Sequence, residues 1–261
     1  MNDDLNGLLL PGERVDDLQL MDLRVIQSPD AFRFGMDAVL LADFARPHPK
    51  SQVCDLGTGT GILPLLLYGR ECSITCDAVE IQPDAAERAA RTIRLNGLEN
   101  VITVHHRDLR EVRSFLSRAS YDLVICNPPY SPSAASLPSP KPALRTARQE
   151  SECTLDDICA AAAWLLRDRA RLTLMLRAAR VAEAFDTLRK HRLEPKRMRF
   201  VHANVSRPAR LALIEAMLNV HAGLITEPPL IAKTMDGNDT QEIIQIYHLP
   251  QEENKRKETN T

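Results

Sequence analysis

The stretch that decides the fold runs from Gln52 to Gly69 and reads QVCDLGTGTGILPLLLYG. It begins with an apolar run typical of a buried strand and ends with an apolar segment that we expect to be helical. Between them, residues 57–61 (GTGTG) hold three of the ten glycines in the chain. Glycines at a strand-to-helix turn let the backbone approach a ligand closely, and the first N–H groups of the helix attract polar ligands. The stretch therefore predicts a nucleotide-type binding turn.

Strand-like and helix-like segments alternate around this turn. We expect strands at 52–56, 74–80, 101–105, 121–126 and 171–176, and helices at 62–69, 84–96, 109–116 and 155–167. This alternation is typical of a parallel, doubly wound α/β sheet with helices on both faces. Beyond it we expect a helix at 181–191, followed by extended stretches at 197–202, 211–217 and 242–247. Consecutive extended stretches predict an antiparallel end to the sheet.

The chain divides into three parts by composition. Residues 1–50 are expected to form an N-terminal extension, with a hairpin-like segment followed by a helix at 36–44. Residues 51–250 form the main domain in this interpretation. The polar, charged tail at 251–261 is expected to be disordered.

Charge and cysteine usage exclude several classes of protein. The 33 Lys and Arg residues nearly balance 35 Asp and Glu residues, so a generally basic nucleic-acid coat is excluded and any RNA contact needs a local patch. The six cysteines are scattered without a CxxC pair, as in reduced proteins. The N-terminus lacks the apolar stretch of a signal peptide, and the longest apolar run, 158–166, is too short to span a membrane. We therefore expect a cytoplasmic protein.

We expect no metal site. His105, His106 and Asp108 are close in sequence, but adjacent residues of a strand point to opposite faces of a sheet. The two imidazoles are therefore poorly placed to bind one ion.

The glycine spacing separates two classes of cofactor. A dinucleotide fingerprint reads G-x-G-x-x-G, but Ile62 or Pro64 stands where its third glycine would fall. The D-x-G-x-G-x-G pattern that starts at Asp55 instead resembles the first motif of S-adenosylmethionine (SAM)-dependent methyltransferases. Glu80 closes the next strand, where a carboxylate accepts hydrogen bonds from both ribose hydroxyls. NAD enzymes share this acidic residue, so Glu80 indicates a nucleoside without choosing between the cofactors.

The residues Asn127-Pro128-Pro129-Tyr130 follow the fourth strand and indicate the chemistry. The two prolines make a rigid turn, and an Asn-Pro pair alone is a common turn at a strand end. The Asn127 side-chain oxygen and the Pro128 carbonyl can accept both hydrogens of an exocyclic amine, while Tyr130 stacks on its ring. Such an arrangement orients a planar amine for direct methyl transfer without a covalent enzyme intermediate. Together with the glycine turn and Glu80, it predicts an N-methyltransferase.

Longer stretches carry a resemblance to one family. Residues 32–42 (FRFGMDAVLLA), 55–67 (DLGTGTGILPLLL) and 126–130 (CNPPY) resemble the bacterial tRNA(Val) adenine N6-methyltransferases, as do 154–158 and 199–202. The resemblance implies a Rossmann-like class I methyltransferase with a seven-stranded, mostly parallel sheet and SAM as cofactor. It further implies a tRNA substrate, methylated at N6 of the purine that lies 3′ of the anticodon. One departure is Gln149, where the family tends to have His.

Roles follow for individual residues. The resemblance implies a catalytic set of Asn127, Pro128, Pro129 and Tyr130. It implies cofactor contacts by Asp55, Gly57, Gly59, Gly61, Glu80, Ile81, Asp108, Leu109 and Asn127, with Asp108 on the adenine amino group, although an Asp there is often a helix N-cap. Candidate RNA-binding cations are Arg33, Lys141, Arg145, Arg148, Lys190, Arg192, Arg197 and Arg199.

Alternatives remain at this point. The same planar-amine chemistry suits guanine N2 in ribosomal RNA or a glutamine side-chain amide in a protein. An NAD-dependent oxidoreductase is opposed by the missing third glycine. A non-catalytic RNA-binding module is opposed by the intact residues 127–130.

Overall fold

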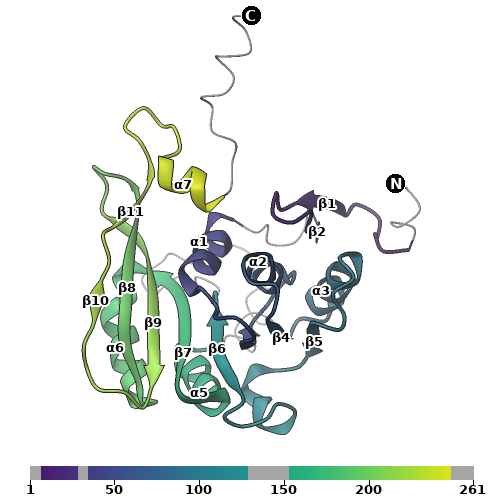
Figure 1. The fold of residues 1–261 in the computed structure, drawn as a ribbon, viewed down its shortest axis with the longest axis horizontal. Helices are drawn as coiled ribbons and strands as arrows, with labels where there is room; N and C mark the ends of the chain where they lie inside the picture. Colours follow the sequence, from purple (N-terminus) through teal and green to yellow (C-terminus); the bar gives the residue numbers. More distant parts are fainter. Residues whose placement is uncertain (1–6, 29–34, 129–152, 248–261) are drawn as a thin grey trace, which may run out of the picture.

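A computed structural model describes residues 7–28, 35–128 and 153–247, and shows a central sheet with helices on both faces (Figure 1). Seven main strands lie in the order β8-β9-β7-β6-β3-β4-β5. Their bounds, in that order, are Leu193–Asn204, Ala209–Leu218, Leu166–Arg177, Tyr121–Cys126, Gln52–Leu56, Thr75–Glu80 and Ile102–His106. Strands β3 to β7 are parallel to one another, and β9 is antiparallel to both β7 and β8. The predicted parallel sheet with an antiparallel end is confirmed. Two short strands, β10 (Ile225–Thr226) and β11 (Leu230–Lys233), pair with β8.

Two hydrophobic cores lie on opposite faces of the sheet. One is covered by α1 (Met36–Ala45), α2 (Ile62–Arg70), α3 (Pro83–Leu95) and α7 (Gln241–Ile246), and the other by α5 (Leu155–Leu165), α6 (Val181–Lys190) and the 3₁₀ helix η1 (Leu109–Ser114). Along β3, Val53 belongs to the first core and Cys54 to the second. Since successive side chains of a strand alternate between faces, strands buried on both sides read as continuous apolar runs. The buried cysteines of these strands pack as small hydrophobic residues.

Some elements differ from expectation. The predicted extended stretch at 242–247 is wrong: Gln241–Ile246 form helix α7. The Thr240 side chain accepts a hydrogen bond from the Ile243 backbone N–H, which is a helix N-cap. Ile243 and Ile246, three residues apart, are both buried, as expected for one face of a helix. The expected helix at 109–116 is the 3₁₀ helix η1, and β7 begins at Leu166, before the expected strand.

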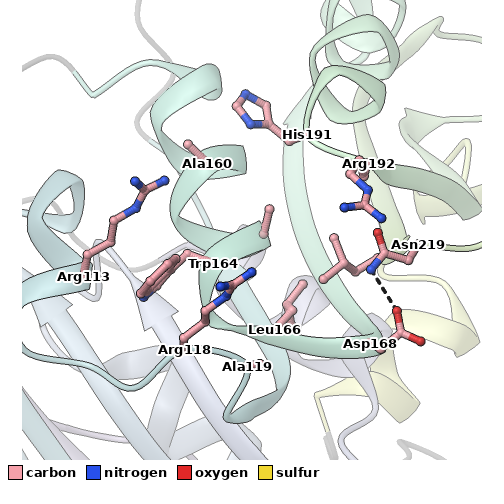
Figure 2. Close-up of a pocket in the computed structure, with 12 residues that line it drawn as sticks. Arg113, Arg118, Ala119, Ala160, Trp164, Leu166, Asp168, His191, Arg192 and Asn219 are labelled. Carbon is pink, nitrogen blue, oxygen red and sulfur yellow. Dashed lines mark hydrogen bonds between the residues drawn. The ribbon is translucent and has the colours of Figure 1, made fainter.

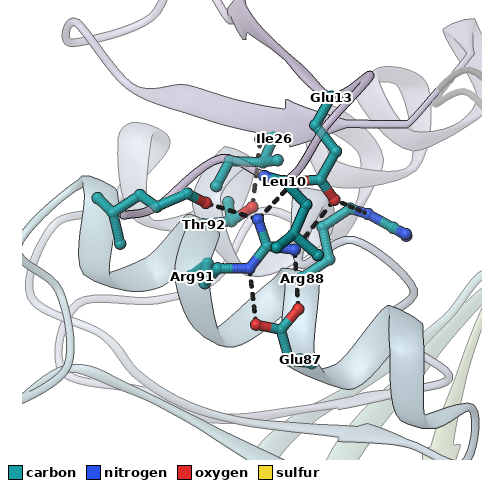
Figure 3. Close-up of polar contacts among 8 residues, drawn as sticks. Leu10, Glu13, Ile26, Glu87, Arg88, Arg91 and Thr92 are labelled. Atoms are coloured by element: carbon teal, nitrogen blue, oxygen red, sulfur yellow. Dashed lines mark hydrogen bonds and ion pairs between the residues drawn. The ribbon is translucent and has the colours of Figure 1, made fainter. Parts of the chain in front are cut away.

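The N-terminal segment docks on helix α3 through a buried ion-pair network (Figure 3). Strands β1 (Arg14–Asp17) and β2 (Arg24–Gln27) form an antiparallel hairpin. The Glu13 carboxylate, whose side chain is 4% exposed, contacts Arg88 at 3.0 Å and Arg91 at 2.5 Å. Arg91 also pairs with Glu87 at 2.7 Å. The hydrogen bond from Arg91 is the largest cause that lowers the pKa of Glu13 to about 2, against the opposing effect of burial.

Replacement of Glu13 by glutamine is expected to destabilise the fold. Removing one partner of a buried ion pair costs about 3 kcal/mol or more in the free energy of unfolding. The matched control is Asp16→Asn, which breaks the solvent-exposed pair with Arg14 in the same hairpin and is expected to cost less than about 1 kcal/mol. Urea denaturation at neutral pH measures both effects.

The loss of stability in Glu13→Gln should depend on pH. Because the pKa of Glu13 is lowered from 4.5 to about 2 in the folded state, its contribution is present above pH 4.5 and is lost as the pH falls toward about 2. The stability difference between wild type and Glu13→Gln should therefore narrow across that range. A difference that stays constant from neutral pH down to about 2 would contradict this assignment.

Candidate functional site

The predicted cofactor residues converge at one edge of the sheet. The glycine turn follows β3, Glu80 ends β4, Asp108 follows β5 and Asn127 follows β6. These four strands are neighbours and parallel, in the order β6-β3-β4-β5, so their carboxyl ends meet at the same edge. Ligands of open α/β sheets bind at this edge.

The glycine turn has a backbone that side chains rarely adopt. Gly57, Gly59 and Gly61 all have positive φ, at 79°, 58° and 80°. A Cβ on Gly61 would lie 3.4 Å from Cβ of Ala89, so this glycine also permits close packing of α2 against α3. A Cβ on Gly57 or Gly59 would meet no atom of the described chain within 4 Å. The turn therefore faces open space at these two glycines, as a ligand-binding loop does.

Strand β4 holds the turn in place. The carbonyl oxygen of Val79 accepts hydrogen bonds from the N–H groups of Gly57 and Thr58, at 2.8 and 3.0 Å. The two carboxylate oxygens of Glu80 accept from the N–H groups of Gly59 and Gln82, both at 2.8 Å. Each carboxylate oxygen can accept a second hydrogen bond, so Glu80 fixes the loop and still offers acceptors to a ligand.

Several oxygen atoms at this edge are buried without a partner among the described residues. Asp55 is fully buried and neither of its carboxylate oxygens has a hydrogen bond there; the same holds for Thr58 Oγ1 and the side-chain oxygen of Asn127. Burial is the main cause that raises the pKa of Asp55 to about 7; the nearby Thr58 hydroxyl opposes the rise, and the charge of Glu80 adds to it. Because buried polar groups in proteins are almost always paired, this cluster indicates a site built for a polar ligand.

The comparisons with known proteins identify the family. The methyltransferase small domain model matches residues 23–139. A tRNA1(Val) (adenine(37)-N6)-methyltransferase of Parabacteroides distasonis is 31% identical over 71% of this chain and 76% of its own. One of Christiangramia forsetii is 25% identical over 84% of this chain and 92% of its own. The chain belongs to the family of tRNA1(Val) (adenine(37)-N6)-methyltransferases.

Solved structures agree on the fold. A predicted O-methyltransferase of Agrobacterium tumefaciens superposes with a TM-score of 0.67 at 22% identity, over 82% of this chain and 96% of its own. TYW2 of Pyrococcus horikoshii superposes with a TM-score of 0.54 at 16% identity, over 80% of this chain and 72% of its own. The class I methyltransferase fold predicted from the sequence is confirmed.

The third edge carboxylate, Asp108, has partners within the chain. It caps η1 by accepting from the backbone N–H of Arg110 at 2.9 Å, and it forms an ion pair with the Arg110 guanidinium. These bonds lower the pKa of Asp108. Leu109, the next residue, is half-buried, and Ile81 beside Glu80 is 38% exposed. Contacts of Asp108, Leu109 and Ile81 with a cofactor stay predictions.

The predicted RNA-binding cations separate into three groups. Arg33, Lys141, Arg145 and Arg148 lie outside the described residues, as do Pro129 and Tyr130. Lys190 ends α6, and Arg192 lies between α6 and β8. Arg197 and Arg199 both form ion pairs within the chain, and their contact with RNA stays a prediction. Arg197 contacts Glu215 and Glu227, both at 3.0 Å, and Arg199 contacts Glu242 at 2.7 Å. Both side chains are less than one-fifth exposed, so they serve packing between β8, β9 and the C-terminal elements.

Among the residues that the structure describes, no group of three or more His, Cys, Asp or Glu side chains is placed to hold a metal ion. His105 contacts Asp77 at 2.6 Å and His106 contacts the Ile81 carbonyl at 3.2 Å, so the two imidazoles have different partners. None of the described helices is long and apolar enough to cross a membrane.

Replacement of Asp55 by asparagine is expected to stabilise the ligand-free protein. The folded-state pKa of about 7 lies above the ordinary 3.8, so the stability linked to this carboxyl is fully present below pH 3.8 and is lost as the pH rises through about 7. The Asp55→Asn variant imitates the neutral form. Its Tm should exceed that of wild type by more at about pH 8 than at about pH 5.

The control is Asp84→Asn, a replacement of the same kind at an exposed position on α3. Thermal unfolding of the three proteins at both pH values measures the effect. A Tm difference for Asp55→Asn that is equal at the two pH values would contradict a buried carboxyl with a raised pKa.

Proposed function

We propose that the protein transfers a methyl group from SAM to the exocyclic N6 of an adenine in tRNA, at the purine 3′ of the anticodon. The observation that carries the proposal is the Asn127 side-chain oxygen, buried without a described partner at the end of β6. Asn127 directly follows β6, which pairs with β3, and the glycine turn follows β3. Relatives named for adenine N6 methylation of tRNA1(Val) supply the substrate class.

The residues present fit SAM. The open space over Gly57 and Gly59 suits the amino-acid part of the cofactor, and the free acceptor capacity of Glu80 suits a ribose diol. Exposed Ile81 offers an apolar contact for the adenine ring. The unpaired carboxylate of Asp55 suits the positive charge of the cofactor, because a nearby cation stabilises its ionised form. SAM supplies a methyl group on a sulfonium, which is electrophilic without further activation.

Asn127 and Pro128 orient the amine. An aromatic amine is a poor nucleophile because its lone pair is delocalised into the ring. The Asn127 side-chain oxygen and the Pro128 carbonyl accept one N–H hydrogen each, which favours a pyramidal nitrogen with its lone pair directed at the methyl group. We expect the ring of Tyr130 to stack on the base. The nitrogen becomes acidic once it is methylated, so no general base is required before transfer.

The direct test is a methyl-transfer assay with labelled SAM and bulk tRNA from a strain that lacks this gene. Nucleoside mass spectrometry of the product should show N6-methyladenosine in one tRNA, next to its anticodon. Methylation of ribosomal RNA or of a protein amide, with unlabelled tRNA, would contradict the proposed substrate and leave the cofactor assignment intact.

The Asn127→Ala variant separates chemistry from cofactor binding. It should lower kcat by about a hundredfold or more, because the amine loses one of the two acceptors that orient it. SAM affinity, measured by calorimetry, should stay within a few-fold of wild type. Normal turnover by Asn127→Ala would show that the mechanism is wrong.

The Gly59→Val variant should lose SAM binding itself. A side chain there occupies the open space over the turn and strains a residue with φ of 58°. Gly97→Val is the matched control, because Gly97 also has positive φ, at 65°, and also faces open space, but it lies at the far end of α3. Calorimetry should show SAM binding for Gly97→Val and none for Gly59→Val. Equal affinity in the two variants would contradict a cofactor site over the glycine turn.

A further inference from the structure

A second concave site lies at the opposite edge of the sheet from the glycine turn. A cavity of about 460 Å³ is bordered by the residues that precede β6, by the C-terminal end of α5, and by the turn between α6 and β8 (Figure 2). Ala119 at its border precedes the first residue of β6, whereas Asn127 follows the last. At the rise of a strand, the length of β6 separates the two sites by about 20 Å. The volume is in the range that small-molecule sites occupy.

Trp164 of α5 forms the aromatic wall of this cavity. The guanidinium groups of Arg113 and Arg118 lie over its ring, 5.0 and 5.1 Å from the ring centre (Figure 2). The indole Nε1 is buried and has no hydrogen-bond partner among the described residues. Trp164 is therefore a half-buried ring with two guanidinium groups over it, and its Nε1–H is enclosed.

The charge of the cavity is not neutralised. Arg113, Arg118 and Arg192 are exposed, and none of them forms an ion pair within the described residues. The acidic residue on the border, Asp168, accepts a hydrogen bond from the Asn219 amide at 2.8 Å. His191 is held by Asp156 at 3.0 Å. Three arginines thus face a cavity whose floor contains apolar side chains such as Leu166 and Leu218.

Unpaired guanidinium groups, an aromatic ring and an apolar floor together match a nucleotide. Arginine suits phosphate because its planar fork of donors complements phosphate oxygens, and it also stacks on aromatic rings and bases. Proteins bind unpaired RNA bases by stacking them on aromatic side chains and guanidinium planes. A bare inorganic anion would use the charge but neither the ring nor the apolar floor.

We propose that this cavity binds a nucleotide of the RNA substrate at a distance from the methylated base, with phosphate on Arg113, Arg118 and Arg192 and a base against Trp164. This inference rests on the proposed function, because it takes the ligand to be part of the tRNA whose target base lies near Asn127. A tRNA extends well beyond the length of β6, so one molecule reaches both edges. The site strengthens tRNA binding and fixes the position of the tRNA on the protein, and it does not contact the reacting atoms.

The first test compares tRNA binding by variants that each remove two positive charges. The Arg113→Ala/Arg118→Ala double variant should bind tRNA about tenfold more weakly than wild type, and its log Kd should depend less on log salt, by about one unit for each phosphate that is no longer bound. Arg94→Ala/Arg207→Ala is the control with the same charge change; both residues are exposed and lie away from the cavity. Affinity for S-adenosylhomocysteine should be unchanged in both double variants.

The salt dependence separates RNA binding from a structural role. If the two arginines only support Trp164, the double variant will show a lower Tm with an unchanged salt slope, which overturns the proposal. Wild-type binding and an unchanged slope in the double variant overturn it as well, while leaving methylation of tRNA by wild type intact. Failure of the wild type to bind or methylate tRNA overturns the proposed function and this inference together.

The second test uses the single tryptophan of the chain as a reporter. Addition of tRNA should quench the fluorescence of Trp164, because a base stacks against the indole. S-Adenosylhomocysteine, bound at the other edge of the sheet, should leave the emission unchanged. Trp164→Leu should weaken tRNA binding, and Trp164→Tyr should restore most of it. Emission that stays constant through a tRNA titration that saturates binding would overturn the proposal.

Discussion

The attachment of the glycine turn to the end of β4 is the constraint on which the proposed site depends. Val79 and Glu80 accept three backbone N–H groups of the turn, at Gly57, Thr58 and Gly59. These bonds require the turn to run back across the neighbouring strand, and that path requires positive φ at the glycines. The first N–H groups of α2 and the carboxylate of Glu80 are consequently held on the same edge of the sheet. The position of Asn127 follows from the pairing of β6 with β3 on the other side.

The binding edge of the sheet lowers the stability of the ligand-free protein. Asp55 is buried without a described partner, and burial raises its pKa to about 7. A carboxylate in such a place destabilises the fold when it ionises, unless a cation or a donor approaches it. Stability is supplied elsewhere, by two cores and by the network in which Glu13 binds Arg88 and Arg91. This arrangement, with stability supplied away from the binding edge, fits a protein whose ligand provides the missing partners at that edge.

Much of the fold was predictable because its signals are local. Strands buried on both faces read as apolar runs, and three glycines within five residues mark a turn with positive φ. The helix at 241–246 was missed because its two buried isoleucines and a threonine cap form too short a pattern to separate from a strand. The contacts of the arginines were not predictable either. Arg197 and Arg199 look like a basic patch in sequence, but their acidic partners are distant in the chain, at Glu215, Glu227 and Glu242. Arg113 and Arg118 come from the stretch that precedes β6, and Trp164 comes from α5, so the sequence spacing does not predict that they meet.

A crystal structure of the complex with S-adenosylhomocysteine would show directly whether the cofactor binds over the glycine turn. We expect the ribose hydroxyls within hydrogen-bond distance of Glu80 and the amino-acid part over Gly57 and Gly59. Asp55 should gain a partner from the ligand or from water fixed by it. A ligand bound away from the carboxyl ends of β3 and β4, with Asp55 still unpartnered, would contradict this placement of the cofactor.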